Sequence, residues 1–272
     1  ALRTWAQDDG NIRALGLTGS RAAPDHPVDE LSDYDVEVFV RDTAPFQENA
    51  RWVAAFGDVM VRWPRSPQPT FSPDWVTQLV QYGDGVRIDF QITEVRSMSE
   101  GRSRERYAVI IDKDEIITGF LQDGPAEDAI KRPTEETFAD RMNAYWWNVI
   151  YVAKTLRRGE INFASYMLDV VIRFECLLPL LEWQIGTRQG WATRTGQCGR
   201  RLNRLLPESE WHRYAATFAD ADPEAMRRAM KATAELVSEV GRQVADHLGY
   251  SYPVATEKRV SAYVRRISAR ER

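Results

Sequence analysis

Two short segments in the first half of the chain alternate between apolar and polar residues, as half-buried β-strands do. The apolar positions are Tyr34, Val36, Val38 and Val40 in segment 33–40, and Val86, Ile88, Phe90 and Ile92 in segment 86–92. The opposite faces hold Asp33 and Asp35 in the first segment and Asp89 in the second. Each segment is therefore expected to turn one face to a core and an acidic face away from it.

After about residue 131 the apolar residues recur at spacings of three and four, which predicts amphipathic helices. The first is expected to begin near Phe138 and to end at Gly159. Further helices are expected over 163–185, 198–206, 208–218 and 224–248. The patterns together predict an α+β fold, with a mixed sheet backed by helices in residues 1–133 and an all-helical domain in residues 134–272.

Composition and net charge limit the class of protein and the kinds of binding partner that fit this sequence. Of 272 residues, 43% are apolar and 28% are charged, as in soluble globular proteins. A net charge of -4 does not favour binding to nucleic acid or to anionic lipid, whereas it suits a cationic partner. The sequence shows neither a signal-peptide core at its first residues nor an uninterrupted membrane span. We expect a cytoplasmic protein with no membrane and no nucleic-acid partner.

The acids of the two alternating segments converge if the two strands are neighbours in one sheet. Asp89 would then lie beside Asp33 and Asp35, and the repulsion among three carboxylates would call for a divalent cation. Magnesium binds carboxylate and phosphate oxygens, and two ions roughly 4 Å apart activate an attacking oxygen and neutralise a leaving pyrophosphate. The alternative is the hydrated face of an ordinary amphipathic strand.

A Gly-Ser turn at Gly19-Ser20-Arg21 precedes the first acidic segment. Free backbone N–H groups, the Ser20 hydroxyl and the Arg21 guanidinium are groups that bind phosphate. The surrounding residues match neither a P-loop nor the nucleophile elbow of the hydrolases. By itself the turn is most simply a surface turn, but its combination with three acids favours triphosphate chemistry.

These elements resemble the nucleotidyltransferase superfamily of the DNA polymerase beta type, whose motif is Gly-Ser, then Asp-x-Asp on one strand and a third acid on a later strand. The fuller strings are similar to those of the aminoglycoside 6-adenylyltransferases, also called streptomycin adenylyltransferases. The matching strings are Gly19-Ser20-Arg21, Ser32-Asp33-Tyr34-Asp35, Arg87-Ile88-Asp89, Tyr145-Trp146-Trp147-Asn148-Val149, Arg173-Phe174-Glu175 and Leu248-Gly249-Tyr250. The resemblance spans nearly the whole chain.

The resemblance implies magnesium-dependent transfer of AMP from ATP to a hydroxyl of a streptomycin-like aminoglycoside, which gives antibiotic resistance. It makes residues 1–133 the nucleotidyltransferase catalytic domain and residues 134–272 the substrate-binding domain. The implied magnesium ligands are Asp33, Asp35 and Asp89, and the implied triphosphate contacts are Gly19, Ser20 and Arg21. Asp89 is the expected general base, and Glu175 is the second choice for that role.

The helical domain supplies further candidates. The resemblance suggests Lys154 and Arg200 as nucleotide contacts, although this chain has Gln197 where the family tends to have a lysine. The acids Asp169, Glu175 and Glu182 are candidates for binding the ammonium or guanidinium groups of the substrate. The alternative for such residues is solvation or a local ion pair, because Asp169 and Arg173 are spaced four apart on a helix.

Two other functions remain open on the sequence. The same chemistry serves nucleotidyltransferases of the toxin-antitoxin type, whose acceptor is a protein or a transfer RNA. A non-catalytic nucleotide-binding protein is the other alternative, although the Gly-Ser turn and all three acids are intact. The oligomeric state is not predicted.

Overall fold

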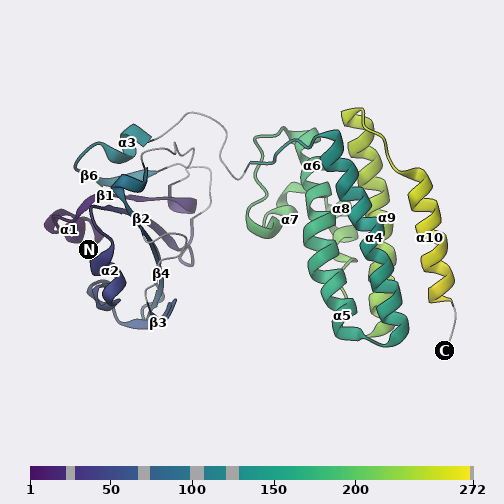
Figure 1. Ribbon diagram of the computed structural model, residues 1–272, viewed down its shortest axis with the longest axis horizontal. Helices are drawn as coiled ribbons and strands as arrows, with labels where there is room; N and C mark the ends of the chain where they lie inside the picture. The colour runs from purple at the N-terminus through teal and green to yellow at the C-terminus, as the bar shows by residue number, and fades with distance from the viewer. Residues whose placement is uncertain (23–27, 67–73, 99–106, 121–128, 270–272) are drawn as a thin grey trace. The chain divides into compact units, whose positions relative to one another are not determined.

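The computed structural model describes residues 1–22, 28–66, 74–98, 107–120 and 129–269. Its contacts divide the chain into two compact units, Ala1–Glu127 and Asp128–Arg272 (Figure 1). Each unit has its own apolar core, one built on a sheet and the other on helices.

The first unit is built on one six-stranded sheet with the strand order β3-β4-β5-β2-β1-β6. The strands are β1 Ile12–Leu17, β2 Tyr34–Val40, β3 Val59–Trp63, β4 Trp75–Tyr82, β5 Arg87–Glu94 and β6 Ala108–Asp112. The β2–β5 pair is parallel, and the other four neighbouring pairs are antiparallel. The predicted mixed sheet is therefore confirmed.

Short helices cover both faces of this sheet. They are α1 Leu2–Asp8, α2 Ala44–Glu48 and α3 Ile116–Phe120, together with the 3₁₀ turns Gly19–Arg21, Arg51–Phe56 and Val95–Met98. On one face, Phe46 of α2 and Ala6 of α1 pack with the apolar side chains of β2 and β5. On the other face, Ile117 of α3 packs with Ala14 and Phe39. Phe39 lies near the carboxyl end of β2, so Ile117 of α3 packs at that end of the face.

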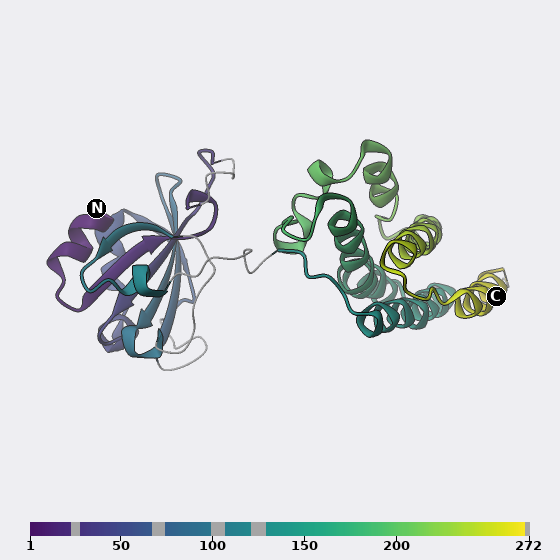
Figure 2. The same cartoon turned by 90° about the horizontal axis from the view of Figure 1, so that it is seen from above.

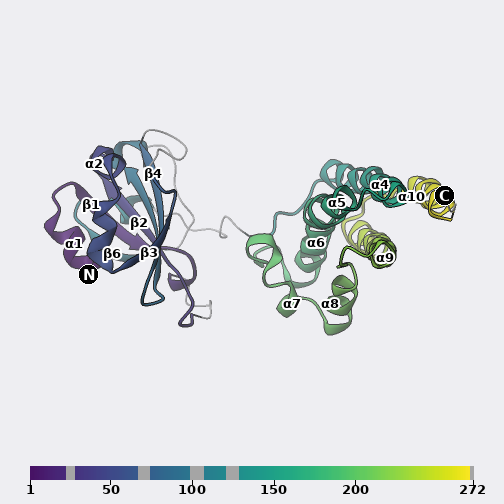
Figure 3. The same ribbon diagram turned by 90° about the horizontal axis from the view of Figure 1, so that it is seen from below.

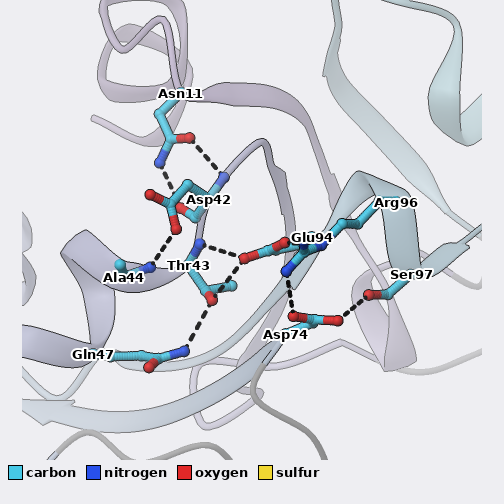
Figure 4. A network of polar contacts seen from close by, with 9 residues as sticks. All are labelled: Asn11, Asp42, Thr43, Ala44, Gln47, Asp74, Glu94, Arg96 and Ser97. Carbon is cyan, nitrogen blue, oxygen red and sulfur yellow. Dashed lines mark hydrogen bonds and ion pairs between the residues drawn. The ribbon is translucent and has the colours of Figure 1, made fainter.

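A polar network fixes the carboxyl end of β5 (Figure 4). Glu94 is 5% exposed and accepts hydrogen bonds from the backbone N–H and the hydroxyl of Thr43, both at 3.1 Å. Its other oxygen pairs with Arg96 at 2.5 Å. Arg96 and Ser97 in turn bind Asp74, at 2.8 and 2.9 Å. A buried carboxylate with this many partners is satisfied within the fold.

The second unit is helical throughout its regular structure (Figures 2 and 3). Its elements are α4 Glu135–Arg158, α5 Ile161–Tyr166, a π-helical segment Met167–Leu177, α6 Leu178–Gln189, a 3₁₀ turn Gln197–Gly199, α7 Leu202–Leu205, α8 Glu208–Ala215, α9 Pro223–Leu248 and α10 Val254–Ser268. The long helix α4 packs against the π-helical segment, α9 and α10. In the described part of the chain, no helix is both long and apolar enough to cross a membrane.

Capping residues explain where the two longest helices begin and end. The Thr134 hydroxyl accepts a hydrogen bond from the backbone N–H of Thr137 at the start of α4, and Gly159 ends that helix in the left-handed conformation with φ 74°. Asp222 caps α9 in the same way, and Gly249 ends it with φ 75°. The predicted end of the first helix and the predicted helix 224–248 are confirmed.

Three details of the sequence prediction are wrong. Segment 198–206 is not one helix, because Cys198 has φ 52° and helix α7 begins only at Leu202. Helix α8 ends at Ala215 instead of continuing to residue 218. Val86 is exposed instead of buried, because it lies in the turn before β5, where its carbonyl accepts a hydrogen bond from the backbone of Tyr82 at 2.8 Å.

Candidate active site

The parallel pairing of β2 and β5 brings the acids of the two strands together. Asp35 is the register partner of Asp89, which places their backbones roughly 4.8 Å apart with both side chains on one face of the sheet. Asp33 lies just before β2, two positions from Asp35. The prediction that the two acidic strands are neighbours is confirmed.

The Gly-Ser turn lies directly beside Asp35. It follows β1, which neighbours β2, and the backbone N–H of Thr18 donates to the Asp35 carbonyl at 2.9 Å. Gly19 has φ 63°, a conformation that favours glycine. A Cβ atom at this position would collide with the Asp35 carboxylate. Glycine is thus required both by the backbone conformation and by the close approach of the acid.

Arg21 organises the entry to β2. Its guanidinium donates to the carbonyl of Ser32 at 2.7 Å and to that of Asp33 at 3.1 Å. It also stacks over the ring of Tyr34, with 3.8 Å between the guanidinium carbon and the ring centroid. In this arrangement Arg21 holds the segment that presents Asp33, and its expected contact with phosphate stays a prediction.

Arg87 lies among the three acids, and the sequence analysis assigned it no role. Its Nε and Nη2 donate to the two carboxylate oxygens of Asp89, both at 2.8 Å, and its Nε lies 3.5 Å from Asp33. The hydrogen bonds to Asp89 raise the pKa of Arg87, and the charges of Asp89, Asp33 and Asp35 raise it further against an opposing effect of burial. The signal available in the sequence was its two-residue spacing from Asp89, which puts both side chains on the same strand face.

The chemistry of these donors fits magnesium, because carboxylate oxygens are the ligands that this ion prefers. Asp33, Asp35 and Asp89 are the residues that could hold it. The described residues are 1–22, 28–66, 74–98, 107–120 and 129–269. Among them, no group of three His, Cys, Asp or Glu side chains lies closely enough together to hold an ion. Both oxygens of Asp89 accept a hydrogen bond from Arg87, so a metal bound to Asp89 would share this carboxylate with the guanidinium.

In the helical unit, Asp169 is engaged in an internal ion pair. It accepts hydrogen bonds from Ser165 at 2.7 Å and from Arg173 at 2.6 Å. Arg173 is 3% exposed, donates to the carbonyl of Thr217 at 2.6 Å and stacks on the ring of Phe218. A buried guanidinium needs such a partner, so Asp169 has a structural task whatever else it does.

Glu175 and Glu182 differ in their surroundings. The side chain of Glu175 is exposed on the π-helical segment, while its backbone carbonyl accepts a hydrogen bond from Arg141. Glu182 is partly buried on α6 and accepts a hydrogen bond from the Thr195 hydroxyl at 2.5 Å. Burial raises the pKa of Glu182, and the bond from Thr195 opposes that shift.

The two candidate cations of the helical unit are exposed. Lys154 lies on α4 with its Nζ 6.0 Å from the ring centroid of Tyr263, and Arg200 follows the turn at Gln197–Gly199, with its side chain against Gly196. Among the contacts described, Lys154, Asp169, Glu175, Glu182 and Arg200 do not bind one another. The structure therefore brings the candidates of the sheet unit together, whereas each candidate acid of the helical unit has its own local surroundings.

Comparisons with known proteins identify the family of this chain. The family model for streptomycin adenylyltransferase matches residues 1–267. The aminoglycoside 6-adenylyltransferase of Bacillus subtilis (strain 168) is 28% identical over 92% of this chain and 89% of that protein, and the one of Campylobacter jejuni is 29% identical over 96% and 91%. The crystal structure of an aminoglycoside 6-adenyltransferase from Bacillus subtilis covers 99% of this chain and 96% of that chain, at 26% identity and a TM-score of 0.53. The chain therefore belongs to the streptomycin adenylyltransferase family, which is a family of nucleotidyltransferase enzymes.

Proposed function

We propose that this enzyme transfers AMP from ATP to a hydroxyl of a streptomycin-like aminoglycoside in a magnesium-dependent reaction, and so gives resistance to the antibiotic. The names of its relatives support the reaction and the acceptor class. The main structural observation in favour is the register that sets Asp35 beside Asp89, with the Gly19 turn against Asp35.

In this proposal the residues of the sheet unit bind the nucleotide. The backbone N–H groups at Gly19 and Ser20 and the Ser20 hydroxyl hold the triphosphate, with Arg21 as a further contact. Asp33, Asp35 and Asp89 hold magnesium. When bound, magnesium lowers the pKa of the attacking hydroxyl and neutralises the charge that develops on the phosphates.

Asp89 is the proposed general base. It takes the proton from the acceptor hydroxyl as the oxygen attacks the α-phosphorus in line with the leaving pyrophosphate. The low exposure of Asp89, whose side chain is 16% exposed, keeps the carboxylate partly shielded from water. Glu175 is the alternative base, and its exposed side chain is free to approach a ligand.

Residues 134–272 form the proposed substrate-binding domain, and residues 1–133 form the catalytic domain. The acceptor is a small cation, which fits a net charge of -4, and neither nucleic acid nor membrane is a partner in a cytoplasmic enzyme. Glu175 is the favoured acidic contact, with Asp169 and Glu182 as further candidates. Lys154 and Arg200 are the proposed nucleotide contacts of this domain.

Mass spectrometry of reaction products tests the proposal. The enzyme is incubated with magnesium, each of the four nucleoside triphosphates in turn and a panel of aminoglycosides. The expected product is streptomycin heavier by one AMP, formed with ATP and abolished by a chelator. An AMP adduct on a protein or a transfer RNA, with every aminoglycoside unmodified, would reject the antibiotic acceptor, and the absence of any adduct would reject nucleotidyl transfer.

A further inference from the structure

One cation lies among the three acids of the site. Arg87 and Asp89 are two positions apart on β5, so their side chains leave the same face of the sheet. The guanidinium binds both oxygens of Asp89 and lies 3.5 Å from Asp33, while Asp35 is the register partner of Asp89. The positive charge of Arg87 therefore interacts with all three acids.

We propose that Arg87 is a resident counter-ion, a positioning residue that holds the acids together before a metal binds and competes with the divalent cation for Asp89. Loading of the site then transfers Asp89 from Arg87 to the metal. The inference rests on the proposed function, because it presupposes that Asp33, Asp35 and Asp89 bind a divalent cation.

The competition follows from the geometry of the ion pair. The bidentate pair places one N–H donor on each oxygen of Asp89, so a metal that binds Asp89 must share these oxygens with the guanidinium. Two cations in contact with one carboxylate also repel each other. The metal and Arg87 therefore compete for the negative charge of Asp89.

The exposure of Arg87 makes the exchange feasible. Its side chain is 41% exposed, so the guanidinium can be hydrated after it leaves Asp89, and solvent screens the pair. Arg173 in the helical unit makes the contrasting case, since it is 3% exposed and has no route to water without unfolding its surroundings. Arg21 is not the counter-ion, because its guanidinium is bound to the carbonyls of Ser32 and Asp33.

Manganese alone, without nucleotide, is the probe, because it takes the same oxygen ligands as magnesium. The variants are Arg87→Gln, which removes the positive charge, and Arg87→Lys, which keeps the charge but cannot form the bidentate pair with Asp89. The matched control is Arg13→Gln in the same unit, because Arg13 also forms a bidentate pair, with Asp114 at 2.6 and 2.7 Å. Manganese affinity is measured by calorimetry, and melting temperature is measured with and without the metal.

For Arg87→Gln we expect a lower melting temperature without metal, because the acids repel each other, and recovery of that loss when manganese is added. Its manganese affinity should exceed that of the wild type by about fivefold, which corresponds to ~1 kcal/mol, the upper end of the range for a solvent-screened ion pair. The manganese affinity of Arg87→Lys should fall between those of the wild type and Arg87→Gln. Arg13→Gln should bind manganese as the wild type does.

Two results would overturn the inference, and they differ from failure of the proposed function. An unchanged or weaker manganese affinity in Arg87→Gln, with a melting-temperature loss that metal does not restore, would make Arg87 a purely structural residue. If Arg87→Gln does not fold, the same comparison with Arg87→Lys decides the question. If neither the wild type nor the variants bind manganese, even with an ATP analogue present, the metal site of the proposed function is rejected together with the inference.

Discussion

The acids of the sheet unit converge on one place, whereas those of the helical unit are dispersed among local partners. Asp35 and Asp89 are side by side because parallel strands pair residue with residue. In the helical unit, Asp169 neutralises the buried Arg173, Glu182 accepts from Thr195, and Glu175 points its side chain to solvent. Convergence of several carboxylates on one place distinguishes the candidate ligand-binding acids from the acids with a structural task.

The network at the other end of β5 supports the same distinction. Glu94 lies on the same strand as Asp89 but is bound by Thr43 and Arg96 and is almost completely buried. One strand thus has a structural acid at its carboxyl end and candidate catalytic groups at its amino end. Helix α3 and the loop at Thr43 close the first end, and the Gly19 turn lies at the second.

The largest effect is expected from Asp35→Asn. The substitution removes one of the three negative charges at the site. Turnover should fall by about a thousandfold or more, because charge stabilisation at the reacting group is lost. The free energy of unfolding should change by less than about 1 kcal/mol, because mutual repulsion is relieved. Initial rates and urea unfolding measure the two quantities.

Asp114→Asn is the control for this variant, since Asp114 is an exposed acid of the same unit that pairs with Arg13. It should retain the wild-type rate. Turnover by Asp35→Asn close to the wild-type rate, at equal stability, would show that convergence of the acids has no catalytic meaning.

The next effect concerns Glu175→Gln. If Glu175 contacts the cationic acceptor, its loss should weaken antibiotic binding by about 1.5–3 kcal/mol, the contribution of a hydrogen bond to a charged group. Nucleotide binding and stability should not change, because the side chain is exposed and the contact from Arg141 is to the backbone. Calorimetry with each ligand on the same protein measures both affinities, and rising salt should weaken antibiotic binding to the wild type.

Asp169→Asn, in the same π-helical segment as Glu175, tests whether the two acids have different tasks. It leaves the buried Arg173 without its carboxylate, so it should lower stability and leave antibiotic affinity of the folded protein intact. The opposite pattern, with unchanged stability and weaker antibiotic binding, would move the substrate contact from Glu175 to Asp169.

A smaller effect is expected from Gln197→Lys in the exposed turn before Arg200. If this turn contacts the triphosphate, an added charge should lower the Michaelis constant for ATP by at most about tenfold, since one partly screened contact contributes about 1 kcal/mol. Steady-state kinetics at saturating antibiotic would measure the change. An unchanged or higher constant would place the turn away from the nucleotide, with Gln189→Lys on the nearby helix α6 as a control for charge alone.

The smallest effect is a pH dependence of stability from Glu182. Because burial raises its pKa, the folded protein holds this proton to higher pH than the unfolded chain does. The resulting stabilisation is present below the unfolded pKa, about 4.5, and is lost as the pH rises through the folded pKa. Glu182→Gln should therefore gain stability relative to the wild type as pH rises above that range, as urea unfolding at several pH values would measure. If the wild type instead gains stability relative to Glu182→Gln as the pH rises, Glu182 has a cationic partner in the fold.

The sequence by itself determined the two acidic strands, the long helices and the candidate acids, because alternation and helical spacing are local properties of the chain. It indicated Asp33, Asp35, Asp89 and the Gly-Ser turn through their spacing, and the resemblance added the family. Cys198 shows the limit of this local reasoning, since its left-handed backbone interrupts the predicted helix 198–206 at its first residue.

Only the tertiary structure decided which of these groups meet. The pairing of β2 with β5 depends on the whole sheet order, and strand spacing alone does not specify which strands become neighbours. The occupation of Asp89 by Arg87 and the collision that excludes any side chain at Gly19 likewise arise from atoms brought together across the fold. The physical reason is that periodicity sets the direction in which a side chain points, whereas long-range packing sets what it meets there.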